Sequence, residues 1–90
     1  MTLPAPQDAT QVATQNMRML RKAHDWTAAQ LGAEMQKRGI NWDRFTVANL
    51  ENGKRQNITV RELVALSEVL EVGLVLLLDN RLAVTATIRS

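Results

Sequence analysis

The sequence contains no cysteine, which excludes a disulfide framework, a thiolate zinc site and a cysteine nucleophile. This absence fits a reducing cytoplasm, where disulfides are rare. Aromatic residues are also scarce, with two tryptophans, one phenylalanine and no tyrosine. With 90 residues, the chain is long enough for one domain with a single modest core.

Long apolar segments are missing as well. The longest strongly apolar run is Leu74–Leu78, which is far shorter than the roughly 20 residues that span a bilayer. The N-terminal stretch MTLPAPQDAT has no basic side chain and no apolar region, so we expect no secretory signal peptide. These features predict a protein that does not bind a membrane.

The sequence also lacks the patterns that mark catalysis. It has no Gly-rich phosphate loop, no nucleophile elbow and no metal-ligand spacing. His24 is the only histidine, and Asp25 and Glu34 do not form an obvious catalytic pair. We therefore expect a protein that is not an enzyme and that binds no metal and no other cofactor.

The net charge of +2 is small, but its distribution is uneven. Residues 18–55 contain eight basic and four acidic side chains, whereas the rest of the chain contains three basic and five acidic ones. A basic middle is typical of a protein with one face that binds nucleic acid. An ordinary mixed surface would give a similar count.

Apolar spacing predicts helices in the first half of the chain. Residues 1–7 form an expected loose arm without basic side chains, and the first helix is expected at about 8–24. The second helix begins at Thr27, because Thr27-Ala-Ala-Gln30 has the form of a capping box. Gly39 is its natural end, since glycine adopts the left-handed conformation without a steric penalty.

The third helix is expected at Asp43–Asn52, with Asp43 as its N-cap and Gly53 after its end. Val47 and Leu50 fall on its core side. Another face of this helix carries Arg44, Ala48 and Asn52, with Phe45 and Asn49 beside it.

The fourth helix begins after Thr59, where Thr59-Val-Arg-Glu62 is a second capping box, and is expected to end at Gly73. Residues 74–78 predict a short fifth helix, too apolar to remain exposed. Beyond Asp79, apolar and polar residues alternate over Leu82–Ile88, which predicts a strand. A lone strand is not stable in water, so it would pair with a second copy of the chain; a disordered tail is the alternative.

These elements predict an all-α fold: a compact bundle of four to five helices at 8–78 with a helix-turn-helix. A C-terminal β-strand in 79–90 is expected to pair across a dimer. Four segments resemble the Cro/C1 phage-repressor family of helix-turn-helix proteins, also called the XRE family. They are Leu20–Ala23, Trp26–Gly32, Thr46–Arg55 with its Leu-Glu-Asn-Gly-Lys-Arg stretch, and Thr59–Leu66.

The resemblance covers about residues 12–78 and implies a function for the third helix. It would lie in the major groove of DNA while the second helix crosses the backbone. The implied base-contacting residues are Arg44, Phe45, Ala48 and Asn49. The implied phosphate-contacting residues are Thr27, Thr46, Asn52, Lys54 and Arg55, to which the basic residues Lys37 and Arg38 are added.

Two further features follow from this comparison. Arg21 and Glu51 match positions that often form an ion pair between the first and third helices of the family. The connection from Met35 to Trp42 is several residues longer than usual, so the second helix gains a turn or the connector bulges. Lys37, Arg38 or Trp42 would then approach DNA, although core packing is the favoured interpretation of Trp42.

The resemblance implies a sequence-specific transcriptional regulator that acts as a repressor in the cytoplasm or nucleoid of a bacterial host cell. Its expected partner is double-stranded DNA with an inverted-repeat operator, which a homodimer would read. The expected dimer interface comprises Leu74, Leu76, Leu78, Leu82, Val84, Ala86 and Ile88. The alternatives are a protein-interaction adaptor or antitoxin-like module and the DNA-binding part of a longer protein.

Overall fold

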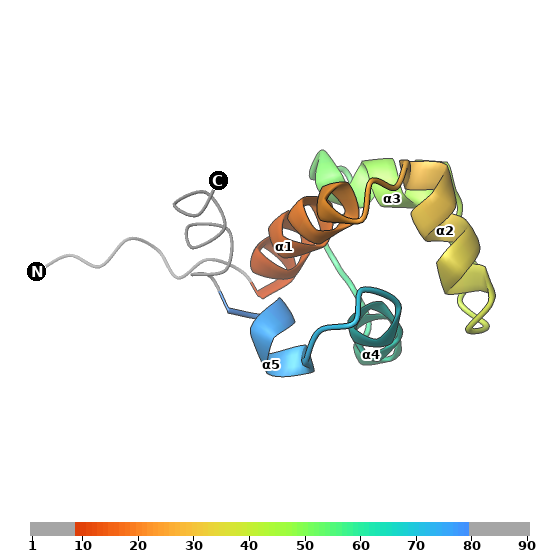
Figure 1. The fold of residues 1–90 in the computed structure, drawn as a ribbon. Helices are drawn as coiled ribbons and strands as arrows, with labels where there is room; N and C mark the ends of the chain where they lie inside the picture. Colours follow the sequence, from red (N-terminus) through yellow and green to blue (C-terminus); the bar gives the residue numbers. More distant parts are fainter. Residues whose placement is uncertain (1–8, 80–90) are drawn as a thin grey trace, which may run out of the picture.

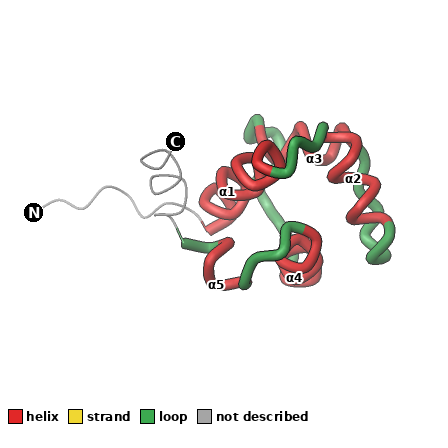
Figure 2. The backbone as a smooth tube through the Cα atoms, viewed as in Figure 1, coloured by secondary structure: helices red, strands yellow, loops and turns green. Residues whose placement is uncertain are grey.

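The computed structural model describes residues 9–79, which form five helices and no strand (Figure 1). They are α1 (Ala9–Ala23), α2 (Ala28–Gln36), α3 (Arg44–Glu51), α4 (Val60–Val69) and α5 (Leu74–Leu77). Short loops connect them, and the two termini of this part of the chain lie near α1 and α5 (Figure 2). The all-α prediction is confirmed for these residues, whereas the expected arm at 1–7 and the expected strand Leu82–Ile88 lie outside them.

Local hydrogen bonds fix where three of the helices begin. At the start of α2, Thr27 Oγ1 accepts from the Gln30 N–H at 3.1 Å, and Gln30 Oε1 accepts from the Thr27 N–H at 2.7 Å. Thr59 and Glu62 form the same reciprocal pair at α4. Asp43 Oδ1 accepts from the Thr46 N–H at 2.9 Å and caps α3. Both predicted capping boxes and the predicted Asp43 cap are confirmed.

The helix ends confirm two predictions and correct one. Gly39 and Gly53 have φ of 80° and 83°, as expected for glycines that follow α2 and α3. Gly73 does not end α4, because the helix stops at Val69 and Glu71 adopts the left-handed conformation with φ of 58°. The Glu71 N–H donates to Glu68 O, which closes α4 before Gly73 is reached. Gly73 instead precedes α5 with φ of −66°.

The core is formed where α1, α2, α3 and α4 meet. Its fully buried side chains include Met17, Leu31, Met35, Val47, Leu50, Leu66 and Leu70. Trp42 is 2 % exposed and belongs to the same cluster, so the core interpretation of this residue is confirmed. Because α2 ends at Gln36, the extra residues before Trp42 lie in the connector and do not lengthen the helix by a full turn. No helix of residues 9–79 is both long and apolar enough to cross a membrane.

Gly32 lets the start of α3 approach α2 closely. A Cβ built on Gly32 would lie 3.0 Å from the carbonyl carbon of Asp43 and 3.1 Å from its Cα. These are backbone atoms, so no side chain can rotate away to make room. The absence of a side chain at Gly32 therefore sets the position of the Asp43 cap and the direction in which α3 leaves it.

Gly32→Ala is expected to destabilise the protein, because overpacking a core contact costs about 1–3 kcal/mol. The better helix propensity of alanine offsets up to about 1 kcal/mol of this cost. Gly73→Ala is the matched control, since no atom lies within 4 Å of its added Cβ. Urea unfolding measures both variants, and equal stabilities would contradict the proposed close contact.

Candidate nucleic-acid interface

The outward face of α3 is polar and accessible. Arg44, Ala48 and Asn52 are exposed, and Phe45 is 61 % exposed although it is a large apolar residue. The Arg44 Cζ lies 4.8 Å from the centroid of the Phe45 ring, which is a cation–π distance. Val47 and Leu50 are buried on the opposite side, so the core fixes which face of α3 points outward.

Asn49 and Thr46 occupy the edges of this face and are half-buried. The backbone carbonyl of Asn49 accepts from the Arg55 N–H at 2.9 Å, which ties the end of the helix to the following loop. The Thr46 hydroxyl lies 3.2 Å from Asp43 Oδ1 and belongs to the N-cap. Thr46 is thus placed at the start of α3 by its cap.

Polar groups that can donate hydrogen bonds lie after the end of α3 and at the start of α2. Asn52 Oδ1 accepts from the Lys54 N–H at 3.0 Å, which leaves the Asn52 amide N–H groups for another acceptor. Lys54 is exposed and has no acidic partner within residues 9–79. Thr27 is exposed at the start of α2, where the helix dipole favours an anion.

Arg55 has a structural contact that the sequence did not reveal. Its Nη2 lies 2.8 Å from both carboxylate oxygens of Glu62, and its Cζ lies 6.0 Å from the Trp42 ring. Its side chain is 29 % exposed. Arg55 therefore holds the loop after α3 against α4, and only part of its guanidinium remains accessible to a phosphate.

Glu62 is the centre of this cluster and was recognised from the sequence only as part of a capping box. Its carboxylate accepts from Trp42 Nε1 at 2.6 Å, from Arg55 and from the Thr59 N–H at 2.8 Å. Burial raises the pKa of Glu62, but the hydrogen bonds from Thr59, Trp42 and Arg55 outweigh it and lower the pKa overall. The ionised carboxylate thus links the connector, the loop after α3 and the start of α4.

Glu62→Gln is expected to lower the stability near neutral pH by about 1–3 kcal/mol, because an amide cannot accept on both atoms. Since the folded state lowers the pKa of Glu62, its contribution is complete above the unfolded pKa of about 4.3 and is lost as the pH falls through the lower folded pKa. The difference from the wild type should therefore shrink under acid conditions. Glu68→Gln, in an exposed pair with Arg38, is the control and should cost at most about 1 kcal/mol. A stability difference between Glu62→Gln and the wild type that stays constant down to acid pH would contradict an ionised Glu62 carboxylate.

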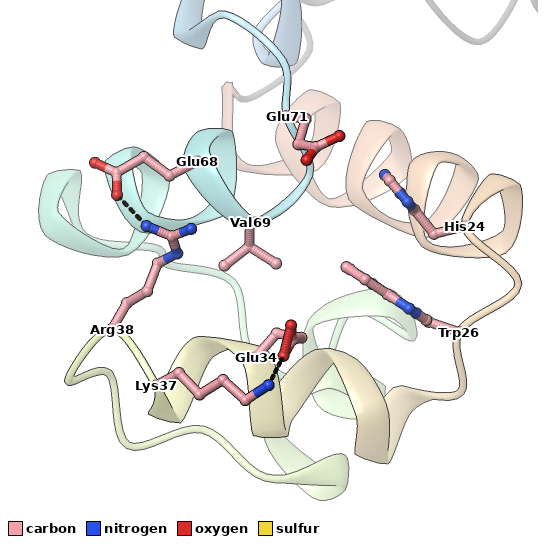
Figure 3. A pocket seen from close by; sticks show the side chains of 8 residues that line it. All are labelled: His24, Trp26, Glu34, Lys37, Arg38, Glu68, Val69 and Glu71. Carbon is pink, nitrogen blue, oxygen red and sulfur yellow. Dashed lines mark hydrogen bonds and ion pairs between the residues drawn. The ribbon is translucent and has the colours of Figure 1, made fainter.

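Lys37 and Arg38 lie away from the outward face of α3. Lys37 Nζ is 2.7 Å from Glu34 Oε2, and Arg38 Nη1 is 2.6 Å from Glu68 Oε2. Figure 3 shows both beside a groove of about 430 Å³ between α2 and α4, to which no residue of α3 contributes. The structure therefore does not group these two residues with the other expected phosphate contacts.

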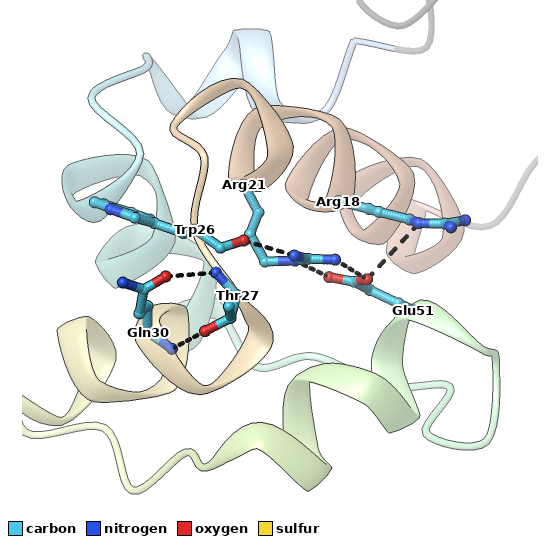
Figure 4. A network of polar contacts seen from close by, with 6 residues as sticks. All are labelled: Arg18, Arg21, Trp26, Thr27, Gln30 and Glu51. Atoms are coloured by element: carbon cyan, nitrogen blue, oxygen red, sulfur yellow. Dashed lines mark hydrogen bonds and ion pairs between the residues drawn. The ribbon is translucent and has the colours of Figure 1, made fainter.

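Arg21 and Glu51 join α1 to α3. Arg21 Nε lies 2.8 Å from Glu51 Oε2, and Arg21 Nη2 lies 2.9 Å from Oε1 (Figure 4). Arg21 also donates from Nη1 to Trp26 O at 2.7 Å. The side chains of Arg21 and Glu51 are 13 % and 11 % exposed. The hydrogen bond to Glu51 raises the pKa of Arg21, although burial opposes this shift. This bidentate pair fixes the C-terminal half of α3 against α1.

The short helix α5 presents an apolar surface. Val75 is 83 % exposed, and the exposed fractions of Leu74, Leu76 and Leu78 are 37 %, 42 % and 37 %. The core therefore does not bury these four side chains completely. The other expected interface residues, Leu82, Val84, Ala86 and Ile88, lie outside the described part of the chain.

Asn16 holds α5 in place, a role that sequence reasoning missed. Its Nδ2 donates to Leu77 O at 2.7 Å and to Asp79 O at 2.9 Å, and the residue is 1 % exposed. The sequence signal for this role was that Asn16 is a polar residue on the core side of α1. Its partners are more than 60 positions away in the sequence, so spacing alone could not identify them.

One comparison with known proteins found a family that fits this geometry. A helix-turn-helix family model matches residues 17–77, from the middle of α1 to the end of α5. Searches of curated proteins and of solved structures found no match. Within residues 9–79, no three histidine or acidic side chains are grouped to hold a metal ion. The matched family consists of DNA-binding regulators, and this chain belongs to it: it is a member of the Cro/C1-type, or XRE, helix-turn-helix family.

Proposed function

We propose that this protein is a sequence-specific regulator that reads double-stranded DNA with α3 in the major groove and represses transcription. The main support is the outward face of α3, where Arg44 is exposed beside Phe45 and has no carboxylate partner within residues 9–79. Arginine binds guanine O6 and N7 in a bidentate manner. Asn49 is the proposed adenine contact, and Ala48 leaves room for close approach.

The proposed phosphate contacts come from the start of α2 and from the residues that follow α3. Thr27 presents the start of α2, while Asn52 and Lys54 follow α3 and are exposed. Phosphate contacts of this kind fix the register of the protein on the duplex without reading its sequence. Thr46 and the accessible part of Arg55 complete the proposed set.

A single α3 reads only a few base pairs, so we propose that the protein acts as a homodimer on an inverted repeat. The apolar surface for the dimer is supplied by Leu74, Val75 and Leu76 of α5 and by Leu78, which follows this helix. Two half-sites about 34 Å apart would then be read together. The site of action is the cytoplasm of a bacterial cell, where the DNA lies.

The test is binding to a random-sequence duplex over a range of salt concentrations, followed by selection of preferred sequences from a random pool. The affinity of a DNA-binding protein falls steeply with salt, with a slope of about −0.9 for each phosphate contacted. We expect such a slope and a selected sequence with two-fold symmetry. Weak, salt-independent binding would contradict the proposal and favour a protein-interaction module.

A further inference from the structure

A second hollow, of about 330 Å³, lies between α1 and α3. Arg18 and Arg21 of α1 line it, together with Ala48, Glu51 and Asn52 of or next to α3. Ala48 and Asn52 also belong to the outward face of α3, one helical turn apart. The proposed DNA-reading face therefore continues into this hollow and meets a residue of α1 that has no role so far, Arg18.

The charges around the hollow do not cancel. Arg21 engages both oxygens of Glu51 with two hydrogen bonds. Arg18 Nε lies 3.8 Å from Glu51 Oε1, beyond hydrogen-bond distance, and its side chain is 57 % exposed. One carboxylate thus faces two guanidinium groups, and the surplus positive charge is on the exposed one.

The orientation of Arg18 is suited to an external anion. In Figure 4, its Nε is the atom that faces Glu51, and its terminal nitrogens lie beyond Nε, away from the carboxylate. The Asn52 amide N–H groups, which are not used by the Asn52–Lys54 contact, can donate in the same region. The terminal nitrogens of Arg18 have no hydrogen-bond partner within residues 9–79, and a planar guanidinium can match two oxygens of a phosphate group.

We propose that Arg18, together with the Asn52 amide, binds one phosphate diester of the DNA strand that borders the major groove on the α1 side. Glu51 orients Arg18 by attracting its Nε, while Arg21 neutralises most of the Glu51 charge. This inference rests on the proposed DNA-binding function and adds α1 to the elements that contact the backbone. Because Arg18 reaches a phosphate and not a base, it acts equally on every DNA sequence.

The experiment is the salt dependence of binding to a random-sequence duplex for the full chain and three variants. Arg18→Gln should reduce the magnitude of the slope of log affinity against log salt concentration by about 0.9. The loss of affinity between 50 and 200 mM salt should then be smaller for this variant than for the wild type by a factor of about 3.5. Arg18→Lys keeps the charge and should keep the wild-type slope. Lys37→Gln removes one positive charge from the α2–α4 groove and should also leave the slope unchanged.

The outcomes separate the two proposals. Two outcomes overturn the Arg18 site and leave the proposed function intact. In the first, the wild-type slope is steep and Arg18→Gln does not change it. In the second, Lys37→Gln reduces the slope as much as Arg18→Gln does. A wild type without steep salt dependence overturns the proposed function itself. Thermal unfolding should show that Arg18→Gln still folds, since the Arg21–Glu51 pair is untouched. If Arg18→Gln does not fold, Arg18→Lys provides the test, because this variant keeps the positive charge. A salt slope that Arg18→Lys lowers would contradict the Arg18 site.

Discussion

Val75→Lys is expected to turn the proposed dimer into monomers and to weaken binding to a two-half-site operator by about 100- to 10,000-fold. Val75 is 83 % exposed on α5, at the centre of the apolar surface that we assign to the interface. An ammonium group placed there would lose its hydration on dimerisation without gaining a partner. The contribution of the second half-site, which depends on the two copies being linked, would then be lost.

Lysine is chosen because its charge alone would strengthen binding to DNA, so weaker binding can come only from the lost dimer. Sedimentation or light scattering gives the oligomeric state, and a duplex selected from a random pool gives the affinity. Val60→Lys is the matched control, because Val60 is 72 % exposed at the opposite end of α4 from α5. A Val75→Lys protein that remains dimeric would rule out α5 as the interface.

The parts of the fold that the sequence predicted are those set by neighbouring residues. The Thr27 and Thr59 capping boxes, the Asp43 cap and the glycine after α3 each depend on atoms within a few positions along the chain. Local rules of this kind do not need the tertiary structure. The local rules failed at Gly73. They assign the left-handed conformation after a helix to glycine, but here Glu71 adopts it.

The contacts that the sequence did not predict join residues that are distant in the chain. Asn16 binds the end of α5, and Glu62 receives Trp42 and Arg55. Each is a polar residue that burial makes dependent on particular partners. Periodicity can place such a residue on a core face, but only the packed helices show which group it meets.

The charge pattern shows the same limit. Residues 18–55 contain eight basic side chains, but five of them lie within 4 Å of a carboxylate. Lys22, Arg44 and Lys54 are the basic residues of this segment without such a partner in the described part of the chain. A count of charges therefore overstates the positive surface that is free to meet DNA, and it cannot show that Lys37 and Arg38 belong to another face.

Arg44→Ala is expected to remove the preference for one base at its position, which corresponds to about 1–3 kcal/mol of discrimination. Arg44 lies in the first turn of α3, and its guanidinium is 4.8 Å from the Phe45 ring with no carboxylate partner in the part of the chain that the structure describes. Such a group is free to bind a guanine with two hydrogen bonds. Arg44→Lys keeps the charge but loses the planar fork, so it should lose discrimination while it retains affinity for random DNA.

Lys54→Ala supplies the contrast, because Lys54 is exposed beyond the end of α3 and is proposed to contact a phosphate. It should weaken binding to all sequences alike and lower the magnitude of the salt slope by about 0.9. Affinities for a panel of duplexes that differ at single base pairs distinguish the two variants. If Arg44→Ala weakened every duplex equally, Arg44 would be a backbone contact, and the reading of bases would have to be assigned to the remaining exposed residues of α3.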